Sequence, residues 1–160
     1  MLTHGDIARR IPHQGRMCLL DRVLAWSPEE IRCEASSHRD PGNPLRAHGR
    51  LGIACGIEYA AQAMAMHGAL LAESAKAGTA ALAAPPRAGY LASLRGVQFH
   101  GSRLDQAEGA LSVHAERVLG DGNSMVYSFE VAAEGRTLVS GRATVVLDAG
   151  MAAQLGATTR

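Results

Sequence analysis

The residues best suited to acid–base chemistry are Glu58 and Gln62, which lie four positions apart in the run GIACGIEYAAQAMAMHGALL. A spacing of four places two side chains on the same face of a helix. One interpretation is a solvent-facing polar pair on an amphipathic helix. The other is a carboxylate that is buried for function, because charged side chains are rarely buried unless they are paired or used. The residue types leave both interpretations open.

A carboxylate at this position is a candidate general acid. Glu58 falls in the first or second turn of the predicted helix, where the helix dipole favours its ionised form. Desolvation among Ile and Ala favours the protonated form instead. If desolvation dominates, Glu58 is able to deliver a proton near neutral pH. Unpaired backbone N–H groups near Gly52 to Gly56 would also stabilise a developing oxyanion.

Three histidines bear on this chemistry in different ways. His48, upstream of the helix, is a candidate general base because histidine titrates near pH 7, although a lone histidine on a loop is more often simply solvated. His13 follows a proline, and we interpret it as a structural residue that organises the N-terminal turn through a hydrogen bond. His67 lies nine residues after Glu58, so it is expected on the opposite side of the helix.

Composition excludes several classes of function. The chain has 160 residues, 47% hydrophobic content and a net charge of +1, which indicate one globular domain without the basic stripe of a nucleic-acid-binding protein. No P-loop, G-x-G-x-x-G or G-x-S-x-G motif occurs, and the seven histidines lack metal-binding spacing. The three cysteines have no C-x-x-C spacing and fit a reducing cytosol.

Two segments bear on localisation. Residues 1–16 contain no apolar core of the kind found in signal peptides. Residues 51–72 are long enough to raise the question of a membrane span. They contain Glu58, Gln62 and His67 and are rich in Gly and Ala, so we predict a buried helix of a soluble cytoplasmic protein with no membrane partner.

One long helix and several strands are expected. Alanine-rich residues 54–75 predict the helix, with Gly78 as its stop. The other predicted elements are a short helix over 5–10, a strand or extended segment over 18–26, and strands over 31–36, 89–99, 109–119, 124–132 and 137–147. Alternation of apolar and polar residues indicates the strands over 31–36, 109–119 and 124–132, and tight turns between successive strands predict an antiparallel meander.

These elements predict a single domain over residues 1–148, followed by a flexible C-terminal tail over 149–160. Gly96 is a candidate β-bulge within its strand, and the adjacent Asp21 and Arg22 are expected to form a structural ion pair or cap. A helix that is apolar nearly all round must be covered on most sides. One curved sheet and a second copy of the chain would cover it.

Two N-terminal motifs carry a resemblance to a known family. IPHQGRMCLLDRV (11–23) followed by GIEYAAQAMA (56–65) resembles the hot-dog-fold β-hydroxyacyl-[acyl carrier protein] dehydratases of fatty-acid and polyketide biosynthesis. GYLASLRGVQFHGSRL (89–104) resembles the strand that borders their acyl tunnel. The similarity extends over residues 5–147. It is greater still to a divergent branch that reads Gly-Ile-Glu-Tyr-Met-Ala-Gln and occurs in aryl-polyene-type gene clusters.

The resemblance implies an α+β hot-dog fold, in which a curved antiparallel sheet wraps one long central helix and the chain dimerises. It implies a hydro-lyase in which Glu58 protonates the departing hydroxyl and His48, from the other subunit, takes the α-proton. No metal or redox cofactor is implied. The substrate is a thioester of acyl carrier protein, pantetheine or CoA, and Arg87 or Arg95 would meet the acidic carrier. The substrate-binding residues that it implies are Gln62, Gly52, Ile53, Gly56, Tyr90 and Leu91.

The chain also departs from the family pattern. It reads AHGRLG where the dehydratases have Gly-His-Phe-Pro, and the spacer from His48 to Glu58 is shorter. The divergent branch typically lacks the loop histidine. Two other hypotheses therefore stand beside a homodimeric dehydratase. One is a non-catalytic partner subunit or acyl-binding module that forms a heterodimer with an active homologous dehydratase. The other is a hot-dog acyl-CoA thioesterase.

Overall fold

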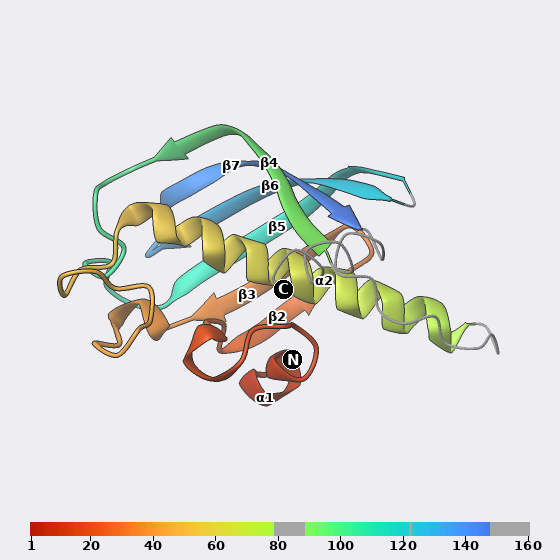
Figure 1. The fold of residues 1–160 in the computed structure, drawn as a ribbon, viewed down its shortest axis with the longest axis horizontal. Helices are drawn as coiled ribbons and strands as arrows, with labels where there is room; N and C mark the ends of the chain where they lie inside the picture. Colours follow the sequence, from red (N-terminus) through yellow and green to blue (C-terminus); the bar gives the residue numbers. More distant parts are fainter. Residues whose placement is uncertain (79–88, 122, 148–160) are drawn as a thin grey trace, which may run out of the picture.

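The computed structural model describes residues 1–78, 89–121 and 123–147. One long helix and one antiparallel sheet dominate the fold (Figure 1). The helices and strands are β1 (Leu2–Thr3), α1 (His4–Ala8), β2 (Arg22–Trp26), β3 (Glu30–Ala35), α2 (Gly56–Ala77), β4 (Gly89–Phe99), β5 (Leu111–Gly120), β6 (Ser124–Ala133) and β7 (Arg136–Leu147). Short 3₁₀ turns are η1 (Gly15–Met17), η2 (Ser37–Arg39) and η3 (Ile53–Cys55).

The seven strands of the described residues form one sheet in the order β1-β2-β3-β5-β6-β7-β4, and every neighbouring pair is antiparallel. Helix α2 lies across the inner face of this sheet (Figure 1). Its main contacts are with the central strands β3, β5 and β6. Strand β4 forms one edge of the sheet, because only β7 pairs with it in the described chain.

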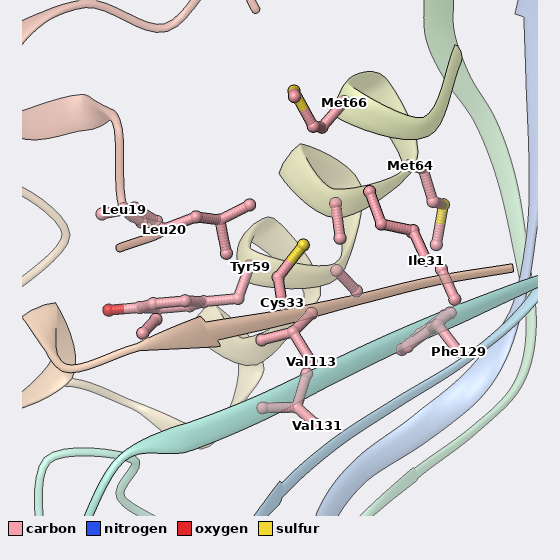
Figure 2. Close-up of a cluster of buried hydrophobic side chains, with 14 of the residues drawn as sticks. Leu19, Leu20, Ile31, Cys33, Tyr59, Met64, Met66, Val113, Phe129 and Val131 are labelled. Carbon is pink, nitrogen blue, oxygen red and sulfur yellow. The ribbon is translucent and has the colours of Figure 1, made fainter. Parts of the chain in front are cut away.

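The core lies between α2 and the inner face of the sheet. Alternate residues of the strands are buried, as the period of a half-buried strand requires. Figure 2 shows side chains of the helix and of the strands meeting in this layer. The labelled members of the cluster are Leu19, Leu20, Ile31, Cys33, Tyr59, Met64, Met66, Val113, Phe129 and Val131, all of which are buried.

Small residues let α2 approach the sheet closely. Gly56, the first residue of α2, is buried, and a β-carbon added to it would lie 2.7 Å from Val139 Cγ2. Such a contact is too short for a real methyl group, so the start of the helix is pressed against β7. Ala60 and Ala63 continue the buried face. The end of α2 is capped by Gly78, as predicted.

Most predicted elements are present, and two expectations are wrong. The meander covers β5, β6 and β7 only, since β4 lies next to β7 at the far edge. Residues 100–110 connect β4 to β5 and form no tight turn, which frees β4 to cross to that edge. Asp21 and Arg22 do not pair with each other. Asp21 accepts a hydrogen bond from Ser36 (2.6 Å), and Arg22 lies 3.3 Å from Glu34.

The arrangement is the hot-dog architecture that the motifs predict, with one long helix wrapped by a curved antiparallel sheet. The predicted bulge is present: Gly96 has φ 57° and lies where the register of β4 against β7 shifts. The predicted tail, 149–160, lies outside the described residues. No helix in the described part of the chain is long and apolar enough to cross a membrane.

Candidate active site

Glu58 lies in the first turn of α2 and is held through one of its two oxygens. Gln62 Nε2 donates a hydrogen bond to Glu58 Oε1 (3.0 Å), so the predicted shared face of these two residues is observed. His13 Nε2 lies 3.0 Å from the same Oε1. Within the described residues, Oε2 makes no hydrogen bond. The side chain of Glu58 is 33% exposed, so it is neither sealed in the core nor free in solvent.

Gln62 is fully buried and joins α2 to the loop before β2. Its Oε1 accepts a hydrogen bond from the Leu19 amide (2.9 Å), and its Nε2 donates to the Met17 carbonyl (2.7 Å) as well as to Glu58. An amide side chain is able to make all of these bonds at once because it carries both acceptor and donor atoms. Gln62 therefore fixes the position of the loop that carries His13 and the orientation of Glu58.

His13 is the residue whose part in the site the sequence did not predict. Its Nε2 faces Glu58 Oε1, while its Nδ1 is buried and has no hydrogen-bond partner among the described residues. The ring thus presents Nε2 to Glu58 and keeps Nδ1 inside the fold. The only sequence signal for this was the proline–histidine motif.

His48 lies on a tight turn away from any contact with Glu58 within the described chain. Ala47 and Arg50 close the turn with two backbone hydrogen bonds of 2.9 and 3.0 Å. His48 and Gly49 both have positive φ values, 52° and 73°, as in a type I′ turn. The imidazole of His48 is exposed and makes no hydrogen bond in this part of the structure. The structure of one chain therefore does not bring His48 and Glu58 together.

The start of α2 differs from the expectation of unpaired amides. The Ile53 amide donates to the Ser102 carbonyl (3.0 Å), and the Cys55 amide donates to Gly52 (3.0 Å). The Gly56 amide donates to the carbonyls of Ile53 and Ala54. The cause is the 3₁₀ turn η3 and the pairing of residues 51–53 with 102–104, which occupy these donors. These three amides are thus not open to an oxyanion.

Tyr90 and Leu91 lie near the start of β4, at the edge of the sheet. They pair with Val146 and Val145 of β7. Leu91 faces the inner side, like its partner, and remains 42% exposed. Arg95 is also on β4, opposite Arg142, whereas Arg87 lies outside the described residues.

Glu58 lines neither of two hollows on the described surface. One, of about 470 Å³, lies on the outer face of β4, β6 and β7, between Arg95 and Arg142. The other, of about 240 Å³, lies beside the loop that Gln62 holds, between His4 and Asp40. A single chain thus supplies an oriented carboxylate, and neither of these hollows is a substrate site at Glu58.

A family model decides which group of proteins this chain joins. The model, described as ApeP-like and as ApeP dehydratase, matches residues 5–155. The chain belongs to the ApeP-like dehydratase family. This confirms the resemblance to the hot-dog dehydratases and to their divergent Gly-Ile-Glu-Tyr branch. No curated protein sequence matches this ApeP-like chain.

Solved structures show the same fold. The dehydratase heterocomplex ApeI:P from Xenorhabdus doucetiae matches with a TM-score of 0.78 and 24% identity, over 93% of this chain and 95% of that one. Thioesterase HI1161 from Haemophilus influenzae has a TM-score of 0.62 and 11% identity, with 92% of each chain covered. AziG of S. sahachiroi has a TM-score of 0.52 and 18% identity, over 80% of this chain and 90% of that one. This ApeP-like chain therefore has the hot-dog fold of dehydratases and thioesterases alike.

Proposed function

We propose that this chain is a catalytic subunit of a β-hydroxyacyl thioester dehydratase, which acts on acyl groups carried by acyl carrier protein or pantetheine. The observation that carries the proposal is the orientation of Glu58. Gln62 and His13 contact Oε1, while Oε2 makes no hydrogen bond within the described residues. We assign Oε2, the oxygen that these two residues leave open, as the atom that delivers a proton to a departing hydroxyl.

The base is proposed to be His48 of a second subunit. His13 is poorly suited to take a proton from a substrate, because its Nε2 faces Glu58 and its Nδ1 is buried. We assign His13 to the orientation of Glu58 instead. His48 is exposed on its turn and its imidazole has no hydrogen-bond partner in the described chain, so it is available to another subunit. This agrees with the family resemblance, in which histidine and glutamate come from different subunits.

The reaction balances with these two groups. His48 removes a proton from Cα of the acyl chain, and the electron pair of that C–H bond forms the Cα–Cβ double bond. The Cβ–O bond breaks, and the hydroxyl leaves as water with the proton of Glu58 Oε2. The product is a trans-2-enoyl thioester. Exchange with solvent then returns the proton of His48 and restores that of Glu58.

The apolar side chains on the inner side of the edge strand β4 support the proposal that a second subunit binds there. Leu91, Leu94 and Phe99 face the helix side and remain 42%, 37% and 45% exposed. An edge strand with free backbone groups and apolar side chains is a ready site for another chain. ApeI:P is described as a dehydratase heterocomplex. We propose as partner a second copy of this chain, which supplies His48, or a homologous dehydratase that supplies an equivalent histidine, with the acyl chain passing along Tyr90 and Leu91.

The test compares the chain alone with the chain plus an active homologous dehydratase. Each is given a β-hydroxyacyl-pantetheine thioester, and both enoyl absorbance and free thiol are followed. Glu58→Gln is expected to lower the rate of enoyl formation by about 10²- to 10⁴-fold, the usual contribution of a general acid. Glu73→Gln is the matched control, because Glu73 lies on the same helix in an exposed ion pair with Arg10 (2.9 Å). It is expected to keep the wild-type rate.

The other hypotheses give different results. Free thiol without enoyl product identifies a thioesterase. Enoyl formation only in the presence of the homologue, at the same rate with Glu58→Gln, identifies a non-catalytic partner. One observation favours the non-catalytic partner: within the described residues of one chain, no histidine that is open to substrate lies next to Glu58. If His48→Ala keeps full activity, His48 is not the base, and the role of Glu58 is unaffected by that result.

A further inference from the structure

Asp105 is a nearly buried carboxylate that lies between two arginines, and the proposed reaction gives it no chemical step. Its side chain is 6% exposed. Arg103 donates to it from Nε (3.1 Å) and from Nη2 (2.6 Å). These bonds from Arg103, together with the bond from the Leu51 amide, hold the pKa of Asp105 well below its ordinary value. The group is therefore ionised throughout the neutral range.

The other partners of Asp105 lie on either side of the His48 turn. The turn consists of residues 47–50. Arg46, directly before it, donates from Nη1 to Asp105 Oδ2 (3.4 Å). Leu51, directly after it, donates its amide to Asp105 Oδ1 (3.1 Å). One carboxylate thus holds both ends of the turn that carries His48.

Arg46 extends this contact into the turn itself. Its Nη1 also donates to the carbonyl of Gly49 (3.0 Å), the residue after His48. Its Nε donates to the carbonyl of Asp40 (2.8 Å), and its Nη2 donates to the carbonyl of His38 (3.1 Å). The guanidinium therefore uses all of its nitrogens on groups that surround the turn. A positive φ at a residue other than glycine persists only where the surroundings hold it, and His48 has φ 52°.

The same residues connect the turn to the start of α2. Leu51 accepts a hydrogen bond from the Leu104 amide (2.8 Å), and Ile53 donates to Ser102 (3.0 Å). Residues 51–53 lead directly into η3 and α2, where Glu58 lies. Asp105 directly follows residues 102–104, the segment of the same chain that pairs with residues 51–53. The carboxylate thereby fixes the turn of His48 relative to the helix that carries Glu58.

We propose that Asp105 is a positioning residue that holds the His48 turn in its left-handed conformation at a fixed place relative to α2. This proposal rests on the proposed function for its catalytic consequence, because a base presented to a second subunit must be displayed at a set position. A loss of about 1 Å in placement costs up to about a hundredfold in rate. Asp105 acts through the turn and touches no reacting atom.

The first test is a double-mutant cycle on dehydration activity. Asp105→Asn keeps the shape of the side chain and places an amide against the guanidinium donors. In the wild-type background it is expected to lower kcat by about tenfold to a hundredfold, with KM changed less. In the His48→Ala background it is expected to cause no further loss, since its effect passes through His48. Equal losses in both backgrounds, or none in the wild type, would overturn the proposal.

The matched control is Asp121→Asn. Asp121 also accepts two backbone amides of a turn, from Asn123 and Ser124 (2.8 Å each), at the other end of the sheet. It is expected to leave kcat unchanged. If Asp105→Asn fails to fold, as judged by its thermal transition, Arg46→Gln serves in its place. Arg46→Gln removes the hydrogen bond from Arg46 to the Gly49 carbonyl and leaves the hydrogen bonds from Arg103 and Leu51 to Asp105 intact.

The second test needs no activity and so separates this inference from the proposed function. Trypsin cleaves after Arg50, an exposed residue of the turn. Cleavage at this bond is carried out under native conditions and monitored by mass spectrometry. It is expected to be at least about fivefold faster in Asp105→Asn and Arg46→Gln than in the wild type and Asp121→Asn. Wild-type cleavage rates in both variants would refute the role of Asp105. Faster cleavage in a chain that never dehydrates any substrate would support the role of Asp105 and reject only the proposed function.

Discussion

His13 Nε2 lies 3.0 Å from Glu58 Oε1, although His13 comes from the loop between α1 and η1 and Glu58 from the first turn of α2. The two side chains are 27% and 33% exposed. Partly solvated pairs of this kind contribute at most about 1 kcal/mol to stability. The contact therefore matters more for the orientation of Glu58 than for the free energy of unfolding.

The first prediction concerns His13→Ala. The change removes one of the two groups that contact Oε1, so Glu58 becomes freer to rotate. We expect kcat/KM for dehydration to fall by about tenfold to a hundredfold, less than for Glu58→Gln. The free energy of unfolding is expected to change by no more than about 1 kcal/mol. Steady-state kinetics and urea denaturation measure the two quantities.

A matched control for this variant exists on the outer face of the sheet. His114 Nε2 donates to Glu30 Oε2 at 2.7 Å, and its side chain is 29% exposed. His114→Ala removes a comparable histidine–glutamate contact far from α2, so its activity is expected to match that of the wild type. Equal activity in both variants would show that His13 does not orient Glu58.

The second prediction compares two glycines of α2. A methyl group at Gly56 would lie 2.7 Å from Val139 Cγ2, whereas nothing lies within 4 Å of the corresponding position at Gly68. Gly56→Ala is expected to destabilise the fold by about 1–3 kcal/mol through overpacking. Gly68→Ala is expected to stabilise it by about 0.5–1 kcal/mol, because alanine favours a helix interior. Urea denaturation measures both changes in the free energy of unfolding. Changes in the same direction for the two variants would contradict the packing argument.

The third prediction concerns the buried Gln62. Gln62→Met keeps the length of the side chain and leaves the Leu19 amide and the Met17 carbonyl without their partner. Each unsatisfied buried group costs about 1–3 kcal/mol, so a loss of at least that size is expected in the free energy of unfolding. Activity is expected to fall as well, since Glu58 loses the hydrogen bond from Gln62. The exposed Gln106→Met is the control, and a variant of Gln62 as stable as this control would refute the bonding role.

Local periodicity predicted that Glu58 and Gln62 share one face of the helix, but it did not predict the contact of His13 with Glu58. The spacing of four between Glu58 and Gln62 fixes their shared face, because 3.6 residues per turn is a local property of the helix. The contact from His13 depends on which loop folds over the start of α2, and spacing along the chain carries no information about that. The hydrogen bonds of Gln62 to Met17 and Leu19 create this contact, and they form only when the fold closes.

The same distinction explains the strands. The strand predicted over 89–99 is confirmed by the structure. Alternation does not say which strand is its neighbour, and β4 pairs with β7 rather than with β5, the next strand in the chain. Likewise, we expected open backbone amides at the start of α2, but the Ile53 amide donates to the Ser102 carbonyl (3.0 Å). Pairing and contact across the fold are set by packing between distant segments.

The last prediction concerns the buried His67 and the response of stability to pH. His67 Nε2 donates to the Ser27 carbonyl (2.8 Å), so Nδ1 must accept from the Tyr127 hydroxyl (2.8 Å). Burial, with a smaller effect of the nearby Arg117, lowers the pKa of His67 below its ordinary 6.5. Glu29 and the bond to Ser27 oppose this shift only in part. In the unfolded chain the same imidazole is free to take a proton near pH 6.5.

The unfolded state therefore binds more protons than the folded state as pH falls below about 6.5, so acid favours unfolding. The contribution of His67 to stability is fully present above that pH and is lost below it, by at most about 1.4 kcal/mol per pH unit. His67→Gln is expected to be less stable than the wild type at pH 7.5 and to lose less stability on acidification to pH 5.5. The pKa of the buried His38 is also lowered, but His38 is present in both proteins and cancels in the comparison. Urea denaturation at the two pH values measures the difference, and equal losses in the two proteins would show that His67 is not the buried group that titrates.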